Sequence, residues 1–189
     1  MVTLEKATQL VKLARKAIET RNIQKSETKE KRGVFVTLST YPEHELRGCI
    51  GYSEPIFSVD EGIQKAAVCA AYSDPRFLPL EKEELDRIIV EVSILTKPVR
   101  IEAKDVKTRL SSITTNKDGL IISYGNRSAL FLPQVWDELP SKEKFLDALC
   151  NKAMLPSDAW TNQNATISKF NVEAFKEITP NGRIAKVKT

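Results

Sequence analysis

Residues 45–51 have the sequence Glu45-Leu46-Arg47-Gly48-Cys49-Ile50-Gly51, which places a thiol, a guanidinium and two glycines within seven positions. Side chains of an extended strand alternate between its two faces. We therefore expect one core face formed by Leu46, Gly48 and Ile50. The opposite face would carry Arg47, Cys49 and Gly51. A thiol close to a guanidinium is a typical setting for a reactive cysteine.

The segments around this stretch predict a sheet covered by a helix. Residues 33–39 are rich in β-branched and aromatic side chains, and a turn at 40–43 would return the chain as an antiparallel hairpin. Ser58 and Glu61 have the spacing of a capping box, which predicts a helix over 58–72. Residues 88–95 are almost continuously apolar, as is typical of a central strand. We expect the hairpin 33–51 and the strand 88–95 to share one sheet.

The remaining segments alternate between helical and extended patterns. Helices are predicted after Thr3 and after Ser141, with weaker patterns at 81–85 and 106–113. Strands are predicted at 119–124 and 129–132, joined by the four residues 125–128, and at 165–178 with a bend. The tail beyond Pro180 is expected to fray. This order predicts an α+β fold with a mostly antiparallel sheet and two unequal lobes, one about 20–100 and the other combining 1–19 with 101–189.

Charge is concentrated in two segments. The chain has a net charge of +4, and the segments 21–32 and 181–189 each carry +3, which leaves about −2 for the rest. We interpret 21–32 as a solvated connection. Proteins that recognise nucleic acids usually present a basic patch on the fold itself. Any nucleic-acid binding is therefore expected to be weak and non-specific.

Several classes of protein are disfavoured by what the sequence contains. The longest apolar run, 66–72, is far shorter than a membrane span, and the first residues do not resemble a signal peptide. Three widely spaced cysteines fit a reducing compartment, so we expect a cytoplasmic protein without disulfides. His44 is the only histidine, so no metal site is expected, and we see neither a calcium loop nor a phosphate-binding glycine motif. No cofactor is predicted.

The hexapeptide and several later segments resemble those of a known family. The hexapeptide 46–51, Leu-Arg-Gly-Cys-Ile-Gly, resembles the signature of the AMMECR domain family. Further landmarks follow in the family's order: Asp74-Pro75-Arg76-Phe77, the strand 91–95, Gly119-Leu120 with 132–135, and 145–153 with Trp160. The resemblance covers roughly 33–160 and implies a single domain over 1–189 with an α+β fold of two unequal lobes. It implies no known reaction, but it suggests a pathway shared with Memo-like and radical SAM proteins.

The candidate site combines the hexapeptide with the loop 72–79. Cys49 and Arg47 are the candidate catalytic residues, and Asp74 and Arg76 would form the opposite wall of a concave site. Gly48 and Gly51 would mark a bulge or a close approach to a ligand. His44 is a candidate base for the thiol. Structural alternatives remain open, since Cys49 is equally typical of a small buried side chain and Asp74 with Arg76 is typical of a local ion pair.

Two function classes therefore remain. The first is an enzyme or enzyme component in a modification pathway, with Cys49 as nucleophile or ligand-contacting thiol and Arg47 binding an anion or the thiolate. The second is a non-catalytic module that binds a protein partner or nucleic acid through a groove lined by the same residues. An unknown small molecule or a protein partner is the expected ligand of the site.

Overall fold

The computed structural model describes residues 2–25 and 28–187 and divides the chain into two compact units. The first comprises residues up to Leu95 together with the segment from Glu173, and the second comprises Thr96–Val172. Helices and two antiparallel sheets make this an α+β fold, as expected. Within the described residues, no helix is long and apolar enough to cross a membrane.

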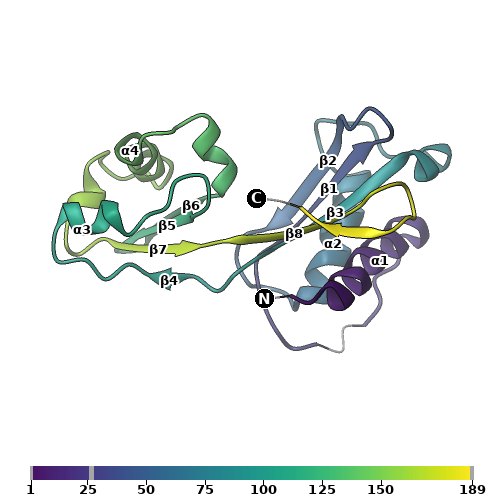
Figure 1. Ribbon diagram of the computed structural model, residues 1–189, viewed down its shortest axis with the longest axis horizontal. Coiled ribbons are helices and arrows are strands. Elements are labelled where there is room, and N and C mark those ends of the chain that lie inside the picture. The colour runs from purple at the N-terminus through teal and green to yellow at the C-terminus, as the bar shows by residue number, and fades with distance from the viewer. Residues whose placement is uncertain (1, 26–27, 188–189) are drawn as a thin grey trace. The chain divides into compact units, whose positions relative to one another are not determined.

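The first unit is a five-stranded sheet with two helices packed on one face (Figure 1). The strand order is β2-β1-β3-β8-β9. The bounds are α1 Leu4–Thr20, β1 Val34–Thr40, β2 Leu46–Tyr52, α2 Val59–Tyr72, η1 Lys82–Arg87, β3 Ile88–Leu95, β8 Val172–Glu177 and β9 Ile184–Lys186. The hairpin and the strand 88–95 therefore share one sheet, and the helix predicted over 58–72 flanks it.

Capping residues begin both helices where the sequence predicts. The Thr3 side chain accepts a hydrogen bond from the Lys6 N–H, and the Ser58 side chain accepts one from the Glu61 N–H. The alanine-rich face of α2 packs on alternate residues of β1, namely Val34, Val36 and Leu38, and α1 packs on α2 and β3. Small side chains let a helix approach the sheet closely. A Cβ at Gly48 would lie 2.2 Å from the Ala70 carbonyl oxygen, so the glycine is required by the contact between β2 and α2.

The second unit is a four-stranded sheet of order β4-β7-β5-β6 with its own core. Its elements are β4 Val99–Arg100, α3 Val106–Ser111, β5 Gly119–Tyr124, β6 Arg127–Phe131, η2 Pro133–Asp137, α4 Lys142–Lys152, η3 Ala159–Thr161 and β7 Thr166–Phe170. Trp136 stacks on Phe145 with ring centroids 3.8 Å apart, and both side chains are buried. β5 and β6 pair up to Tyr124 and Arg127, so only Gly125 and Asn126 form the turn that we expected to contain four residues.

The expected lobes require a correction. The N-terminal helix and the last strands belong to the first unit, whereas the sequence pattern placed them with 101–189. The reason is that α1 buries Leu10, Val11 and Ala14 in the first core. The tail also differs from the expectation of fraying, because Ile184–Lys186 pairs with β8 and buries Ile184. The last basic residue, Lys188, lies outside the described residues.

One buried ion pair joins the ends of the first unit. Arg15 of α1 donates through Nε and Nη2 to the Glu177 carboxylate, both at 2.6 Å, and its guanidinium also reaches the Leu85 and Ile88 carbonyls. Glu177 further accepts the Val90 N–H. These groups satisfy one another in the core, so this pair is architectural.

Candidate functional site

The hexapeptide strand β2 is an edge strand with a bulge. Its register against β1 shifts between Leu38 and Ser39, so that Leu46 pairs with Ser39 while Gly48 pairs with Leu38. Arg47 is the extra residue. Leu46 therefore leaves the core face on which we expected it, and it is 46% exposed. Beyond the bulge the expected alternation holds, since Ile50 packs on the core and Cys49 faces the other way with Thr37.

The two glycines of the hexapeptide have packing roles. Gly48 accommodates α2, as described above. A Cβ at Gly51 would lie 2.2 Å from a ring carbon of Phe35, the residue paired with it on β1. Gly51 thus leaves room for an aromatic ring on the face that carries Cys49. Neither glycine needs a ligand to explain it.

The loop after α2 binds the outer edge of β2 at Cys49. The Asp74 carboxylate accepts the Cys49 N–H at 2.8 Å, and Arg76 Nη2 donates to the Cys49 carbonyl oxygen at 3.1 Å. These are the backbone groups that an edge strand would otherwise leave unpaired. The same carboxylate accepts Arg76 Nη2 at 2.7 Å and Nε at 3.0 Å. Asp74 and Arg76 therefore act together as a substitute for a neighbouring strand.

This arrangement has clear electrostatic consequences. The Arg76 guanidinium, with the N–H groups of Cys49 and Arg76, holds the pKa of Asp74 well below its usual range in spite of burial. In turn, Asp74 raises the pKa of Arg76, and the Cys49 side chain adds to the effect. The Cys49 side chain therefore lies within interaction distance of a guanidinium whose side chain is 52% exposed.

Arg47 is bound elsewhere. It donates through Nε and Nη2 to the two carboxylate oxygens of Glu84, at 2.7 and 3.0 Å, and it lies over the Phe77 ring. This contact lowers the pKa of Glu84. Arg47 Nη1 is buried without a hydrogen-bond partner in the described residues. The guanidinium that interacts with Cys49 is thus that of Arg76, whereas the sequence pattern favoured Arg47.

The thiol of Cys49 belongs to a polar row on the sheet face away from the helices. Cys49 is half-buried, and Thr37 Oγ1 donates to its sulfur at 3.3 Å. Thr37 pairs with Cys49 on one side and with Glu91 of β3 on the other. Burial raises the pKa of Glu91, and the charge of Lys176 on β8 opposes this effect. Cys49, Thr37, Glu91 and Lys176 are called the polar row below.

His44 lies outside this group. It is exposed in the β1–β2 turn with a φ of 61°, and its contact is an edge-on packing against the Tyr41 ring. Five residues of extended chain, about 16 Å, separate it from Cys49. The structure gives no contact between this candidate base and the thiol.

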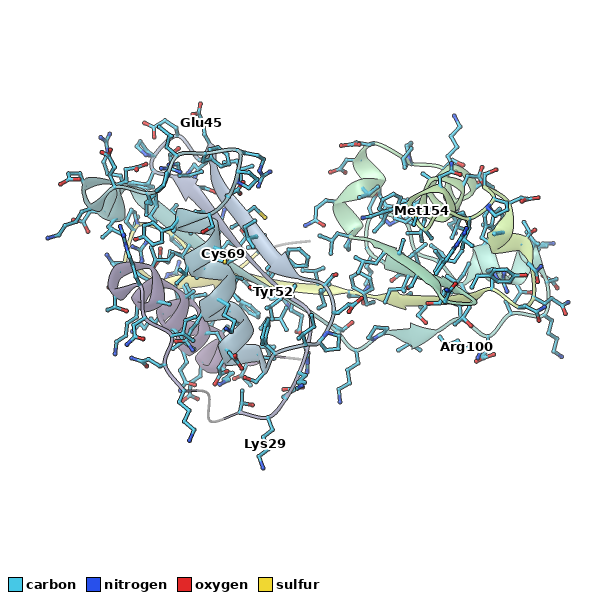
Figure 2. All side chains as sticks on the ribbon, turned by 180° about the vertical axis from the view of Figure 1, so that it is seen from behind. Lys29, Glu45, Tyr52, Cys69, Arg100 and Met154 are labelled. Atoms are coloured by element: carbon cyan, nitrogen blue, oxygen red, sulfur yellow. The ribbon has the colours of Figure 1, made fainter. Side chains whose placement is uncertain are left out.

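The other two cysteines lie in different surroundings. Cys69 projects from α2 near Tyr52 of β2, both labelled in Figure 2, and burial together with Cys69 raises the Tyr52 pKa. Cys150 is fully buried in the second core, where burial raises its pKa. Within the described residues, no cluster of His, Cys, Asp and Glu side chains is suited to hold a metal ion.

Sequence reasoning missed four residues around the hexapeptide. Thr37, Glu84 and Lys176 gave no signal, because all three lie in segments whose pattern is explained by secondary structure. Glu91 did give one, since it is the only charged side chain in the apolar strand Ile88–Leu95. A carboxylate in a central strand needs either a partner or a function.

Several archaeal proteins are similar to this chain over most of its length. The sequence is 43% identical to protein MJ0810 of Methanocaldococcus jannaschii over all of this chain and 98% of that protein. It is 47% identical to protein TV1384 of Thermoplasma volcanium over 82% of this chain and 77% of that protein. The crystal structure of the uncharacterized protein PH0010 from Pyrococcus horikoshii matches with a TM-score of 0.78 and 40% identity, covering 100% of this chain and 99% of that one.

The names of these relatives state no activity. The profile of one family, AMMECR1, matches residues 7–175. This range includes the hexapeptide, the loop that binds it and three residues of the polar row, Cys49, Thr37 and Glu91, whereas Lys176 lies one residue beyond it. The chain therefore belongs to the AMMECR1 family.

Proposed function

We propose that this protein is an enzyme or enzyme component of the cytoplasm in which the Cys49 thiol is the reacting or ligand-contacting group. Three free cysteines support a reducing compartment. The ligand is an unidentified small molecule or a group presented by a protein partner. The link to Memo-like and radical SAM proteins implied by the family resemblance is part of this proposal.

One observation carries the proposal: a half-buried thiol accepts a hydrogen bond from the Thr37 hydroxyl, and the Arg76 guanidinium is bound to the backbone carbonyl of the same cysteine. Negative charge that develops on the sulfur would face both donors, and cysteines in such electropositive surroundings are the reactive ones. Arg76 is held in place by Asp74 yet keeps half of its side chain exposed, so it can also bind an anionic group of the ligand. Asp74 and Arg76 thus have both the structural role and the site role considered from the sequence.

The other candidates receive supporting roles in this proposal. Arg47 positions η1 by binding Glu84, and its guanidinium lies over the Phe77 ring. Gly48 and Gly51 set the strand's position between α2 and Phe35. Whether these residues line a concave site together remains a prediction. His44 is not assigned a step, because its contact is with Tyr41.

The test is a site-resolved rate of alkylation. Iodoacetamide would be applied to the folded protein and each cysteine peptide quantified by mass spectrometry. We expect Cys49 to react faster than a free thiol at neutral pH, and Arg76→Gln to slow it about 3- to 10-fold through loss of the neighbouring charge. Arg87→Gln, at an exposed arginine of η1, is the matched control.

The buried Cys150 reports opening of the second core in the same samples, and urea denaturation of each variant reports the folding of the first unit, which holds Cys49 and Arg76. If Cys49 reacts no faster than a free thiol, and if Cys49→Ser still captures the same cellular ligands, the enzyme hypothesis loses its support.

A second candidate, a non-catalytic binding module, is favoured by a separate groove. Its volume is about 670 Å³, and its lining includes Lys25, Lys29 and Lys31 beside Ile56 and Phe57. This lining suits an acidic partner or nucleic acid held mainly by charge. Binding of a fluorescent single-stranded oligonucleotide should then weaken steeply with salt and be lost in a variant with all three lysines changed to Gln. Retained, sequence-selective binding by that variant would contradict this candidate.

A further inference from the structure

We propose that Glu91 is the proton-exchanging residue of the Cys49 site, and that the ligand is an electrophile whose leaving group takes this proton. The inference rests on the proposed function and extends it from the edge of the sheet to its central strand.

Register places the two groups on one face. Thr37 pairs directly with Cys49 on β2 and with Glu91 on β3, and residues that pair directly project to the same side of a sheet. Two strand spacings across the sheet, from β2 to β3, separate the backbones of Cys49 and Glu91 by roughly 10 Å. A ligand of ordinary size on this face can contact both side chains, with Thr37 between them.

Glu91 lacks the guanidinium partner that three other carboxylates of the first unit have. Asp74, Glu84 and Glu177 each bind a guanidinium through both oxygens. In the part of the chain that the structure describes, the Glu91 carboxylate has no hydrogen bond or ion pair. It therefore contributes nothing that explains a charged residue in this apolar strand.

The groups facing Glu91 are known from each neighbouring strand. Thr37 lies beside it on β1 and does not titrate, and Lys176 of β8 favours the carboxylate. Cys49 and Arg76 lie one strand further away at the β2 edge. Burial outweighs Lys176 and raises the Glu91 pKa, which brings the protonated form closer to neutral pH. General acids work best when their pKa is near the operating pH.

The chemical step balances without an added co-reactant. The thiolate sulfur of Cys49 forms a bond to an electrophilic carbon of the ligand. The bond from that carbon to its leaving group breaks, and the electron pair stays with the leaving group. That group takes the proton from the Glu91 carboxyl, which becomes a carboxylate. An acyl or similar carbonyl compound fits this requirement.

The first measurement is the pH profile of iodoacetamide alkylation, read separately at Cys49, Cys69 and Cys150. Glu91→Gln removes a negative charge about 10 Å from the thiol, so the alkylation rate of Cys49 at neutral pH should rise about 3- to 10-fold. Glu91→Asp keeps the charge and should stay close to the parent protein. Cys69, on the opposite side of the sheet, should not change.

The second measurement is the titration of the Glu91 carboxyl carbon by NMR in the parent protein and in Cys49→Ser. Coupling between two ionisable groups is reciprocal, so the high-pH part of the Glu91 titration should disappear when the thiol is removed. The Glu91 midpoint should lie above that of an ordinary glutamate in both proteins.

The outcomes separate this inference from the proposed function. Fast alkylation of Cys49 that Glu91→Gln leaves unchanged, or an ordinary Glu91 titration, overturns the role of Glu91 and leaves the thiol proposal standing. A slow Cys49 in the parent protein with a coupled Glu91 titration overturns the thiol's reactivity but keeps the two groups in one site. A weakened urea transition in Glu91→Gln would mean that the first unit is unfolding, and the NMR titration of Cys49→Ser then decides the question alone.

Discussion

The two faces of the first sheet use the same strands for opposite purposes. The helix face is closed by Val34, Val36 and Leu38 packing on α2, and its most buried charged pair, Arg15 and Glu177, is fully satisfied. The other face carries the polar row, in which Glu91 has no hydrogen bond or ion pair within the described residues and Cys49 is half-buried. Perturbed carboxylates that the architecture does not explain are candidates for functional groups. We therefore attribute stability to the helix face and place the proposed chemistry on the other face.

Disturbing the charged pair of the helix face should have the largest effect on stability. Glu177→Gln leaves the Arg15 cation buried without a counter-charge, so we expect a loss of about 3 to 5 kcal/mol in the free energy of unfolding. Urea denaturation measures this. The double variant Arg15→Met with Glu177→Leu should recover much of the loss, because no charge is then left uncompensated. A single variant as stable as the parent would contradict the architectural role.

The contact between β2 and α2 is the next test. Gly48→Ala places a methyl group 2.2 Å from a backbone oxygen, and no rotamer change can relieve this clash. We expect about 3 kcal/mol of destabilisation in the same denaturation experiment. Gly62→Ala is the matched control, because the contacts there begin at 3.0 Å and involve a side chain. Equal effects of the two substitutions would mean that Gly48 does not set the strand's position.

The edge of the sheet should give a smaller, pH-dependent effect. Asp74→Asn weakens the bonds to the Cys49 N–H and to Arg76, so we expect a loss of about 2 kcal/mol at pH 7. The pKa of Asp74 is lower in the folded state than in the unfolded chain. Its contribution is therefore complete above the ordinary aspartate pKa of about 4 and is lost as the pH falls through the folded value.

Denaturation series between pH 7 and pH 2 check this sign. The gap between parent and Asp74→Asn should narrow below about pH 4. A gap that stays constant down to pH 2 would show that the carboxylate charge is not what holds the loop on β2.

How far the sequence predicts this molecule depends on whether a feature is local. The strands, the Thr3 and Ser58 caps and the position of Cys49 follow from alternation and capping, which are properties of neighbouring residues. A bulge near Gly48 is one of the alternatives that the glycines indicate, but its position at Arg47 and the exposure of Leu46 do not follow, because they depend on the register of two strands. The pairing of α1 and β9 with the first unit also depends on which core buries them. The choice of Arg76 over Arg47 required knowing where the loop after α2 returns.

Glu91→Gln should have the smallest effect on stability, and its sign should be opposite to that of the other substitutions. Burial raises the Glu91 pKa, so the folded protein holds this proton more tightly than the unfolded chain does. Ionisation of Glu91 therefore costs stability as the pH rises above the ordinary glutamate pKa of about 4.3, and the full cost is present above the folded value. Glu91→Gln should stabilise the protein at pH 8 by about 0.5 to 1 kcal/mol, within the range of ordinary stabilising substitutions, and have little effect at pH 4. Thermal melts at the two pH values measure the difference, with Glu91→Asp as the charged control.

A destabilised Glu91→Gln at pH 8 would show that this carboxylate supports the fold as Glu177 does. Carboxylates on both faces of the sheet would then stabilise the protein. A stabilised variant that has also lost the coupling to Cys49 would identify Glu91 as a residue kept at a cost in stability, as expected of a group that works in a site.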